Sequence, residues 1–528
     1  MIIPRAKKEI SSGNSHALSA PLTVRLDSES AFAAWVISEM LPYLSPTVTD
    51  ASDAAVSVEI SPEISEKDEF YRLVSKGGRV TVVAKDKRGA VNAIATLSQI
   101  ISEARGNYYI DELEIEDYPD KPFRSFMLDT GRKYIPLDEM RAEILMMAKA
   151  KMTKLHWHIT DSEGCPVYFD TIPNIKSPDP DGRKYTKSEI CEIVEYAGGF
   201  MIDVIPEVDM PGHSFALVKS NPELACKADK VEGWDICIGG EECYKYAEGI
   251  LTELAEIFPY EYIHIGTDEI DMLDIVSERG AQTQDWYKCP VCNEKFSRLG
   301  LDTVTDRFYY FVNRVYAILK KLGKKMIMWN DNIDVSKSPD LPRDILIEFW
   351  RVAAEKRGPR EGCSMKRFLE EGFTVINADY PNTYIDLPEY LNWNKLRTWN
   401  LVADPAKADG YAGKIIGAET CAWDIQRHYA FSLYTTVPAF ADRCYNLAPI
   451  TDDEEFGIAL TRLSLGASVP RGFNMFEDIL CDFILGYNDC KIFKESADRQ
   501  SFKRTLTSLR ATSKDQEKLI SAYLDLLD

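Results

Sequence analysis

Two neighbouring carboxyl residues, Asp268 and Glu269, follow a short apolar run at residues 262–265, after two intervening residues. Cleavage of a glycosidic bond needs a proton for the leaving oxygen and negative charge near the anomeric carbon, and paired carboxyl groups supply both. An isolated Asp-Glu dipeptide is usually a solvated loop. The residues around the pair therefore decide whether it does chemistry.

Polar and aromatic residues also follow the other apolar or β-branched runs of the chain. Charged residues and a histidine follow the first four runs, and mainly aromatic residues follow the last four. These residues are Arg132, Asp161, Glu207, His213, Trp329, Trp350, Tyr384, Asp386 and Trp423. Core packing does not require such residue types at one end of every run, so we expect them to form a site.

The eight runs themselves are predicted as strands, because the intervals between them are long enough for a crossover helix. They lie at residues 126–128, 154–159, 201–205, 262–265, 325–329, 345–349, 374–377 and 414–418. This alternation predicts an α/β fold in which eight parallel strands close into a (β/α)8 TIM barrel. In such a barrel the functional groups lie on the loops that leave the carboxyl ends of the strands.

Two further regions flank the predicted barrel. Strand-like alternation and an amphipathic helix predict a small α/β domain at residues 1–118. The strands are predicted at residues 23–26, 55–60, 71–74 and 79–84, and the helix at 89–102. A polar stretch containing Pro119 and Pro122 places the domain boundary there. The barrel is then predicted at 119–445, followed by a helical C-terminal region at 446–528.

Composition excludes several classes of function. The 528 residues include 62 Lys and Arg against 84 Asp and Glu, and a formal charge of −22 repels nucleic acid and anionic membranes. No stretch approaches the ~20 apolar residues that span a bilayer. The first residues carry no secretion signal, so we expect a cytoplasmic location unless a leader was removed. The twelve cysteines lack a disulfide-framework spacing, which fits reduced thiols, and the oligomeric state stays open.

Four motifs in the predicted barrel carry a resemblance to a known family. They read LDTGRKY at 128–134, KLHWHITD at 154–161, IPEVDMPGHS at 205–214 and HIGTDE at 264–269. With these motifs in this order, the chain resembles glycoside hydrolase family 20 from about residue 55 to 445. The unit before the barrel also resembles the small domain that precedes the barrel in that family.

The resemblance implies a β-N-acetylhexosaminidase that needs no cofactor and removes terminal, non-reducing β-linked N-acetylhexosamine from a glycan or amino-sugar glycoside. In this family the sugar's own 2-acetamido oxygen replaces the enzyme nucleophile, which gives an oxazolinium intermediate and retention of configuration. Glu269 would be the general acid and base, Asp268 would orient the acetamido group, and Tyr384 would hydrogen-bond its oxygen. The remaining implied site residues are Arg132, Asp161, His213, Trp329, Trp350, Trp399, Asp386 and Trp423.

One departure from the family pattern concerns the sugar's outer hydroxyl groups. The family often has a Glu two residues after the tryptophan that follows the last strand, but this chain has Ile425 there. Either Asp424 or Gln426 replaces that acid, or the sugar specificity differs. N-acetylglucosamine, N-acetylgalactosamine and, as in a lacto-N-biosidase-like or sulfated-sugar enzyme, a modified substrate therefore stay open.

Two rival functions come from the same residues. His156 and His158 lie on one face of a predicted strand, where they could chelate zinc with His213 and Asp268 in a metal-dependent barrel hydrolase. A catalytically silent sugar-binding relative is the other rival, although the chain has kept both acids and Tyr384.

One cysteine pair has the spacing of a metal knuckle. Cys289 and Cys292 are spaced like zinc ligands, but a structural zinc site needs four ligands and no second such pair stands in the sequence. We therefore expect a tight turn there, and whether the pair binds metal stays open.

Overall fold

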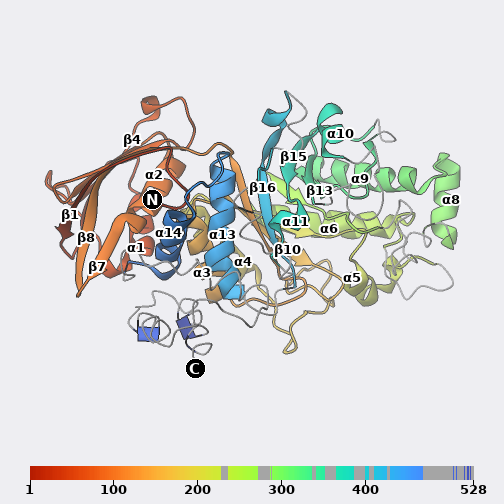
Figure 1. Cartoon of the computed structure of the whole chain (residues 1–528). Coiled ribbons are helices and arrows are strands. Elements are labelled where there is room, and N and C mark those ends of the chain that lie inside the picture. Colours follow the sequence, from red (N-terminus) through yellow and green to blue (C-terminus); the bar gives the residue numbers. More distant parts are fainter. Residues whose placement is uncertain are drawn as a thin grey trace.

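The computed structural model describes most of the chain up to residue 467. The described residues are 1–227, 236–270, 286, 288–335, 340–350, 364–385, 396, 399–402, 410–424 and 429–467, with isolated positions after residue 500. Figure 1 shows an N-terminal sheet with its helices on one side and a barrel on the other. Helices α13 (Tyr429–Tyr445) and α14 (Asp453–Leu465) lie between these two parts.

The N-terminal part is a mixed sheet with the strand order β1-β8-β5-β6-β4-β2-β3, and β7 pairs with β8. Its strands are β1 (Lys8–Leu18), β2 (Thr23–Leu26), β3 (Thr47–Val48), β4 (Val56–Ile60), β5 (Tyr71–Lys76), β6 (Arg79–Ala84), β7 (Ile101–Ala104) and β8 (Asn107–Asp117). Its helices are α1 (Ala33–Met40) and α2 (Lys87–Ile100).

The sequence predicted β2, β4, β5, β6 and the helix, but not β1, β3, β7 or β8. Strand β1 is exposed along nearly its whole length, so its sequence carries no alternation of apolar and polar residues. Helix α2 begins before the predicted residue 89 because the Asp86 side chain accepts a hydrogen bond from the Gly89 backbone N–H, at 2.8 Å.

All eight predicted barrel strands are present, and the barrel closes where β16 pairs with β9. The strands are β9 (Phe123–Asp129), β10 (Lys154–Thr160), β11 (Asp203–Val208), β12 (Tyr262–His264), β13 (Lys325–Trp329), β14 (Leu346–Phe349), β15 (Thr374–Asn377) and β16 (Ile415–Ala422). Every neighbouring pair in the ring is parallel, which confirms the predicted TIM barrel.

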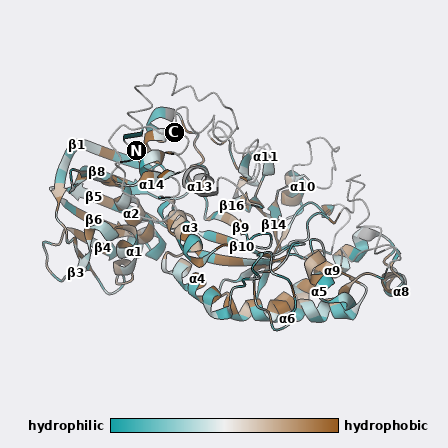
Figure 2. Cartoon of the chain, turned by 90° about the horizontal axis from the view of Figure 1, so that it is seen from below, coloured by the Kyte–Doolittle hydropathy of each residue, from teal (hydrophilic) through white to brown (hydrophobic). Residues whose placement is uncertain are grey.

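Helices connect the strands on the outside of the barrel. The longer ones are α3 (Leu137–Lys149), α4 (Lys187–Gly199), α6 (Glu241–Ile257), α8 (Pro290–Leu299) and α9 (Val304–Lys321). Shorter ones are α5 (Phe215–Ser220), α10 (Met365–Glu370), α11 (Tyr380–Thr383) and the 3-10 turns Pro222–Leu224 and Ala412–Lys414. Two more 3-10 turns, Pro42–Leu44 and Pro62–Ile64, belong to the N-terminal part. Hydrophobic and hydrophilic residues alternate along α6 and α9 (Figure 2), as expected of helices that bury one face. No helix in the described ranges is long and apolar enough to span a membrane.

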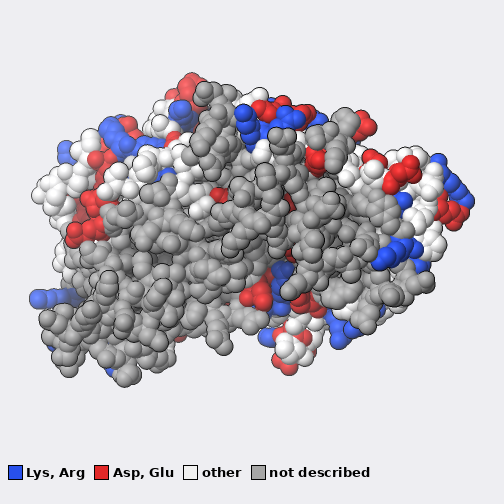
Figure 3. Space-filling view, turned by 45° about the vertical axis from the view of Figure 1, so that its right-hand side comes forward, with Lys and Arg blue, Asp and Glu red and all other residues white. Residues whose placement is uncertain are grey.

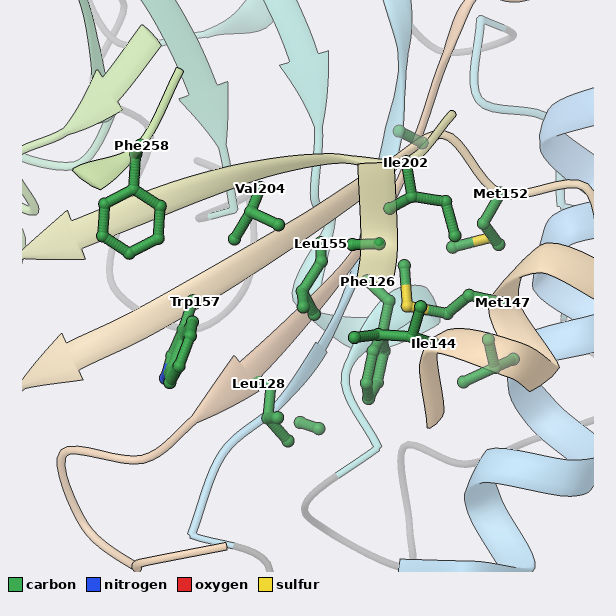
Figure 4. Packing of buried hydrophobic residues seen from close by; sticks show 14 of the residues in the cluster. Phe126, Leu128, Ile144, Met147, Met152, Leu155, Trp157, Ile202, Val204 and Phe258 are labelled. Carbon is green, nitrogen blue, oxygen red and sulfur yellow. The ribbon is translucent and has the colours of Figure 1, made fainter. Parts of the chain in front are cut away.

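The outward face of the first strands packs against α3. Phe126 of β9 and Leu155 of β10 point toward Ile144 and Met147 of that helix, and all four are buried (Figure 4). The same strands therefore use their alternate residues to fill the barrel.

The interior of the barrel changes from apolar to polar to aromatic along the strands. The apolar layer consists of Phe123, Ile205, Ile327, Leu346 and Ile376. Two residues further on, the same strands present Ser125, Glu207, Trp329, Glu348 and Ala378. Alternate residues of a strand face the same side, so polar and aromatic groups gather toward the carboxyl ends. The sequence motifs lie at that end.

A buried ionic network joins the N-terminal sheet to the barrel. Lys151, just before β10, lies 2.8 Å from Asp117 at the end of β8. The hydroxyl groups of Tyr71 and Tyr445 donate to the same carboxylate oxygen at 2.9 and 3.1 Å. All four side chains are buried, so the two parts share one polar contact as well as apolar surface.

Figure 3 shows the charged side chains on one face of the molecule. Acidic and basic side chains are intermingled among the described residues of that face.

We expect Lys151→Met to lower the free energy of unfolding by about 3 kcal/mol, because it leaves Asp117 buried without its cation. Urea unfolding followed by circular dichroism measures this change. Lys245→Met is the control, since Lys245 pairs with Glu242 on an exposed helix face and such pairs contribute under about 1 kcal/mol. Equal effects of the two substitutions would contradict the importance of the buried network.

Candidate active site

A chain of alternating acids and histidines runs from the barrel interior to its rim. Glu207 at the end of β11 contacts Nδ1 of His158. Nε2 of His158 lies 3.0 Å from Asp161 Oδ2, and Asp161 Oδ1 lies 3.1 Å from His213 Nδ1. Each of the three acid–histidine contacts fixes the orientation of the next ring or carboxylate.

The two predicted catalytic acids stand at the outer end of this chain. Nε2 of His213 lies 3.5 Å from Asp268 Oδ2 and 3.3 Å from Glu269 Oε2. The Asp268 side chain is 11% exposed and that of Glu269 is 40% exposed. The structure thus brings together Asp161, His213, Asp268 and Glu269, and it leaves Glu269 the most accessible.

The protonation states along the chain alternate as the geometry requires. Burial alone would lower the pKa of His158 and of His213, but Glu207 raises the first and Asp161 with Asp268 raises the second, both well above the usual range. Burial would raise the pKa of Asp161, but His213 and His158 hold it well below its usual range. At neutral pH this series of side chains therefore contains charged histidines between carboxylates.

Asp209, which was not predicted as a site residue, lies against Asp268. Burial and the neighbouring Asp268 carboxylate raise the pKa of Asp209 well above its usual range. The approach of this side chain requires Gly266, because a Cβ there would lie 1.8 Å from Asp209 Oδ1. Asp209 lies within the third motif, four residues before His213. This position in the motif is the sequence signal that could have identified Asp209 as a site residue.

The backbone around the acids is strained. Thr267 and Glu269 have φ values of 79° and 51°, and His213 has a φ of 47°. Side chains other than glycine rarely adopt this left-handed conformation, which costs of order 1–3 kcal/mol at each residue. Three such residues at one rim mark the place where the fold holds functional groups in an imposed geometry.

A second missed residue, Asp331, supports Glu269 from the next strand. Its Oδ2 accepts a hydrogen bond from the Glu269 backbone N–H at 2.8 Å, and its Oδ1 accepts one from Trp350 Nε1 at 3.2 Å. Asp331 stands two residues after Trp329 at the end of β13. It therefore connects the acid pair to the aromatic part of the site.

Arg132 lies on the other side of Asp161. Its guanidinium is 3.0 Å from Asp129 and 2.8 Å from Asp161, and it lies over the Trp423 ring at 5.2 Å. The backbone N–H of Asp424 donates to the same Asp129 carboxylate at 3.1 Å. The carboxylates of Asp129 and Asp161 thus hold the Arg132 guanidinium at the rim of the barrel.

Four predicted aromatic residues form one group at the end of the barrel. Trp423 lies 6.0 Å from Trp329 and 6.2 Å from Tyr384, measured between ring centroids, and Tyr384 stacks on Trp350 at 6.2 Å. Trp329 is fully buried and donates its Nε1–H to Glu207 at 2.8 Å. Trp329 therefore acts as a wall of this aromatic group rather than as an exposed platform.

Trp399 differs from the prediction. It stacks on Phe440 of α13 at 5.8 Å, and its carbonyl accepts hydrogen bonds from Arg443. Trp399 therefore packs in the main hydrophobic core, apart from the four site aromatics named above. In the sequence, a tryptophan that packs in the core cannot be told from a tryptophan that lines a site, so Trp399 was assigned to the site. The predicted Asp386, Ile425 and Gln426 lie outside the described residues.

The histidines of the rival metal site are bound to carboxylates. His156 lies 2.8 Å from Glu419 and 3.2 Å from Glu207. Burial would lower the pKa of His156, but these carboxylates raise it to about 9. Together with His158, which contacts Glu207 and Asp161, His156 belongs to the hydrogen-bonded interior.

Comparison with known proteins agrees with this geometry. Residues 122–444 match the catalytic domain of glycosyl hydrolase family 20, and residues 1–118 match domain 2 of the same family. The first match alone covers more than half of the chain. The chain belongs to glycosyl hydrolase family 20. The resemblance predicted from the four motifs is confirmed.

Family 20 relatives are similar to the chain over different lengths. The chain is 30% identical to β-hexosaminidase subunit A1 of Dictyostelium discoideum over 366 residues, which is 67% of this chain and 65% of that protein. It is 26% identical to a β-hexosaminidase of Porphyromonas gingivalis over 314 residues, which is 55% of this chain but 39% of that protein. The chain thus spans less than two thirds of these relatives.

Solved family 20 structures share the fold. An exo-β-N-acetylglucosaminidase from Vibrio harveyi, in complex with N-acetylglucosamine, has a TM-score of 0.75 at 21% identity. The alignment covers 89% of this chain and 78% of that one.

We expect Asp161→Asn to lower the pKa of His213 by about 1 unit or more, because it removes the carboxylate nearest to Nδ1. In the wild type the raised folded-state pKa means that protonated His213 stabilises the fold fully below pH ~6.5, and this contribution is lost as pH rises through the folded-state pKa. NMR of isotope-labelled histidine follows the ring directly, and the chain has six histidines.

Asp129→Asn is the control for that titration, because Asp129 contacts Arg132 and not His213. If both variants shift the His213 titration equally, the coupling of His213 to Asp161 is wrong.

Proposed function

We propose that this family 20 chain is an exo-acting β-N-acetylhexosaminidase that cleaves a terminal β-linked N-acetylhexosamine with retention of configuration. Membership of the family, the Asp268–Glu269 pair and the aromatic group with Tyr384 support this proposal. The names of the relatives, which are β-hexosaminidases, agree with it.

One observation carries the proposal furthest. Asp268 Oδ1 is buried and accepts no hydrogen bond from an N–H group or an alcohol or phenol hydroxyl among the described residues, while Oδ2 faces His213 and the Asp209 carboxyl group lies beside the same side chain. A buried acceptor without a partner costs free energy unless a ligand supplies a donor. Burial raises the pKa of Asp268, and His213 opposes this shift. The N–H of a 2-acetamido group is a donor of the required kind, and it becomes more acidic as the acetamido oxygen attacks.

In the first step of the proposed reaction, the acetamido oxygen attacks the anomeric carbon while Glu269 gives its proton to the leaving oxygen. The bond between the anomeric carbon and that oxygen breaks, and an oxazolinium forms. Asp268 accepts the acetamido N–H and stabilises the positive charge, and Tyr384 donates a hydrogen bond to the attacking oxygen. The nucleophile is part of the substrate, so the two enzyme acids can be neighbours in sequence.

In the second step Glu269 acts as a base and removes a proton from water, which opens the oxazolinium at the same carbon. Two displacements at one carbon restore the original configuration. The accessibility of Glu269 suits this exchange of a proton with leaving group and water.

Recognition of the sugar divides between two sides of the site in this proposal. Arg132, fixed by Asp129 and Asp161, would bind sugar hydroxyl groups. The group formed by Trp329, Trp350 and Trp423 would enclose the acetamido methyl and the apolar face of the ring.

The experiment that tests this function compares p-nitrophenyl β-N-acetylglucosaminide, β-N-acetylgalactosaminide and β-glucoside, each with and without brief EDTA treatment. We expect hydrolysis of the acetamido sugars only, because the glucoside has no acetamido oxygen to act as nucleophile. Glu269→Gln should lower kcat about 10²–10⁴-fold, and less for p-nitrophenol than for an alkyl aglycone, which depends more on the proton. The ratio of rates for the two acetamido sugars assigns the preferred sugar.

Glu261→Gln serves as the control, since Glu261 is an exposed acid at the opposite end of β12. Turnover of the glucoside, or activity abolished by brief EDTA treatment, would favour other hydrolase mechanisms. Absence of turnover with all three substrates would point to a sulfated or disaccharide substrate or to a sugar-binding relative.

Tyr384→Phe removes one hydroxyl group and should lower kcat roughly 10²–10³-fold, the usual effect of losing one oxyanion-type donor. Tyr380→Phe is the matched control, because Tyr380 is a neighbouring tyrosine whose ring centroid lies 6.2 Å from that of Tyr384. Steady-state kinetics on the preferred acetamido sugar distinguishes them. Similar losses in both variants would argue against the role assigned to Tyr384.

A further inference from the structure

Four cysteines that are distant in sequence meet at one buried point. Cys226 and Cys237 lie in the connection between β11 and α6, and Cys289 and Cys292 lie at the start of α8. Their sulfur atoms are all within 4.8 Å of one another, and all four residues are buried. Cys237 Sγ lies 3.6 Å from both Cys289 Sγ and Cys292 Sγ. All four are free thiols.

This spacing is that of a tetrahedral metal site. A zinc ion with four sulfur ligands at ~2.3 Å holds those sulfurs about 3.8 Å apart. A disulfide would require ~2.05 Å. We infer that Cys226, Cys237, Cys289 and Cys292 form a structural Zn²⁺ site in this protein.

The local backbone prepares the first pair of ligands. An antiparallel bridge joins Ala225 to Ile236, and the Cys237 N–H donates to the Leu224 carbonyl at 2.7 Å. This bridge places Cys226 and Cys237 next to each other, although they do not form a Cys-x-x-Cys motif. The prediction of a tight turn considered only Cys289 and Cys292, and it lacked this second pair.

The second pair stands where thiolates are stabilised. Cys289 is the N-cap of α8 and Cys292 lies in its first turn, where the positive end of the helix dipole favours negative charge. The Lys227 backbone N–H also donates to Cys289 Sγ at 3.3 Å. Zinc binds the deprotonated sulfur, so these features favour the ligand form.

Close packing of the two segments requires a glycine. A Cβ at Gly239 would lie 2.5 Å from Cys292 Cα and 3.1 Å from Cys292 Sγ. The turn that follows Cys237 is closed by a hydrogen bond from the Gly240 N–H to the Cys237 carbonyl at 3.0 Å. The turn after Cys237 and the first turn of α8 therefore lie close enough for their cysteines to bind one ion.

The site would connect the two segments that leave the catalytic strands. The connection that holds Cys226 and Cys237 begins with Asp209 and His213, and the segment that holds Cys289 and Cys292 follows Glu269. The sulfurs pair with one another and with backbone groups, not with the acid–histidine chain. The zinc ion therefore has a structural role, and its four protein ligands leave no open position for a substrate.

The test measures metal in the purified 528-residue chain by elemental mass spectrometry. We expect about one zinc per chain, because four cysteines complete one tetrahedral site. Cys226→Ser and Cys237→Ser should lose the zinc and lower the Tm. Cys243→Ser is the matched control, since Cys243 is buried in α6 close to the cluster but is not part of it, and it should keep the zinc.

Cobalt substitution of the unmutated chain provides a readout that does not depend on the folding of a variant. Cobalt bound by four thiolates gives intense tetrahedral d–d and charge-transfer absorption, which we expect to appear. A chain purified from zinc-supplemented cells with no zinc, a chain that holds iron instead, or a disulfide within the cluster would each overturn the assignment. None of these measurements uses a glycoside, so they stand apart from the test of enzyme activity.

Discussion

A buried chain of opposite charges positions the candidate active site. Ionised groups inside a protein are stable only when partners of opposite charge and hydrogen bonds replace water. Glu207, His158, Asp161 and His213 meet this condition as an unbroken series. Each member holds the next, so the position of Asp268 and Glu269 at the rim follows from groups deep in the barrel.

The balance of protonation extends beyond that chain. Burial lowers the pKa of His264, whereas burial and the neighbouring Glu419 raise that of Glu348 well above its usual range. Some buried groups are therefore neutral beside others that are charged, which limits the net charge inside the barrel. A substitution that changes one charge will shift the protonation of its neighbours, since the groups titrate together.

The scaffold around these groups tolerates a strained rim. Residues with left-handed backbone conformations flank the acids, and such strain persists only when the surrounding structure determines it. The closed barrel provides this support because each strand is hydrogen-bonded on both sides. The N-terminal sheet adds the Lys151–Asp117 contact at the amino end of β10, and the proposed zinc site would restrain the segments beyond the acids.

Local patterns in the sequence determined most of the architecture. Eight strands, the helix at α2 and the four motifs could be predicted because alternation and short spacing are properties of neighbouring residues. The exposed strand β1 was missed for the same reason, since it has no apolar face to reveal it. The family could also be predicted, because its motifs are continuous in the chain.

Only the tertiary structure decided which distant residues meet. Asp331 supports Glu269, Asp209 lies against Asp268, and Trp399 packs on α13 instead of joining the other aromatic residues. An isolated backbone bridge places Cys226 next to Cys237, and the packing of the loops brings this pair to Cys289 and Cys292 without any continuous motif. The sequence by itself determined which chemical groups follow the strands. Closure of the barrel and the packing of its loops decided their partners, because contacts between distant segments depend on the whole fold and leave no periodic signal in the chain.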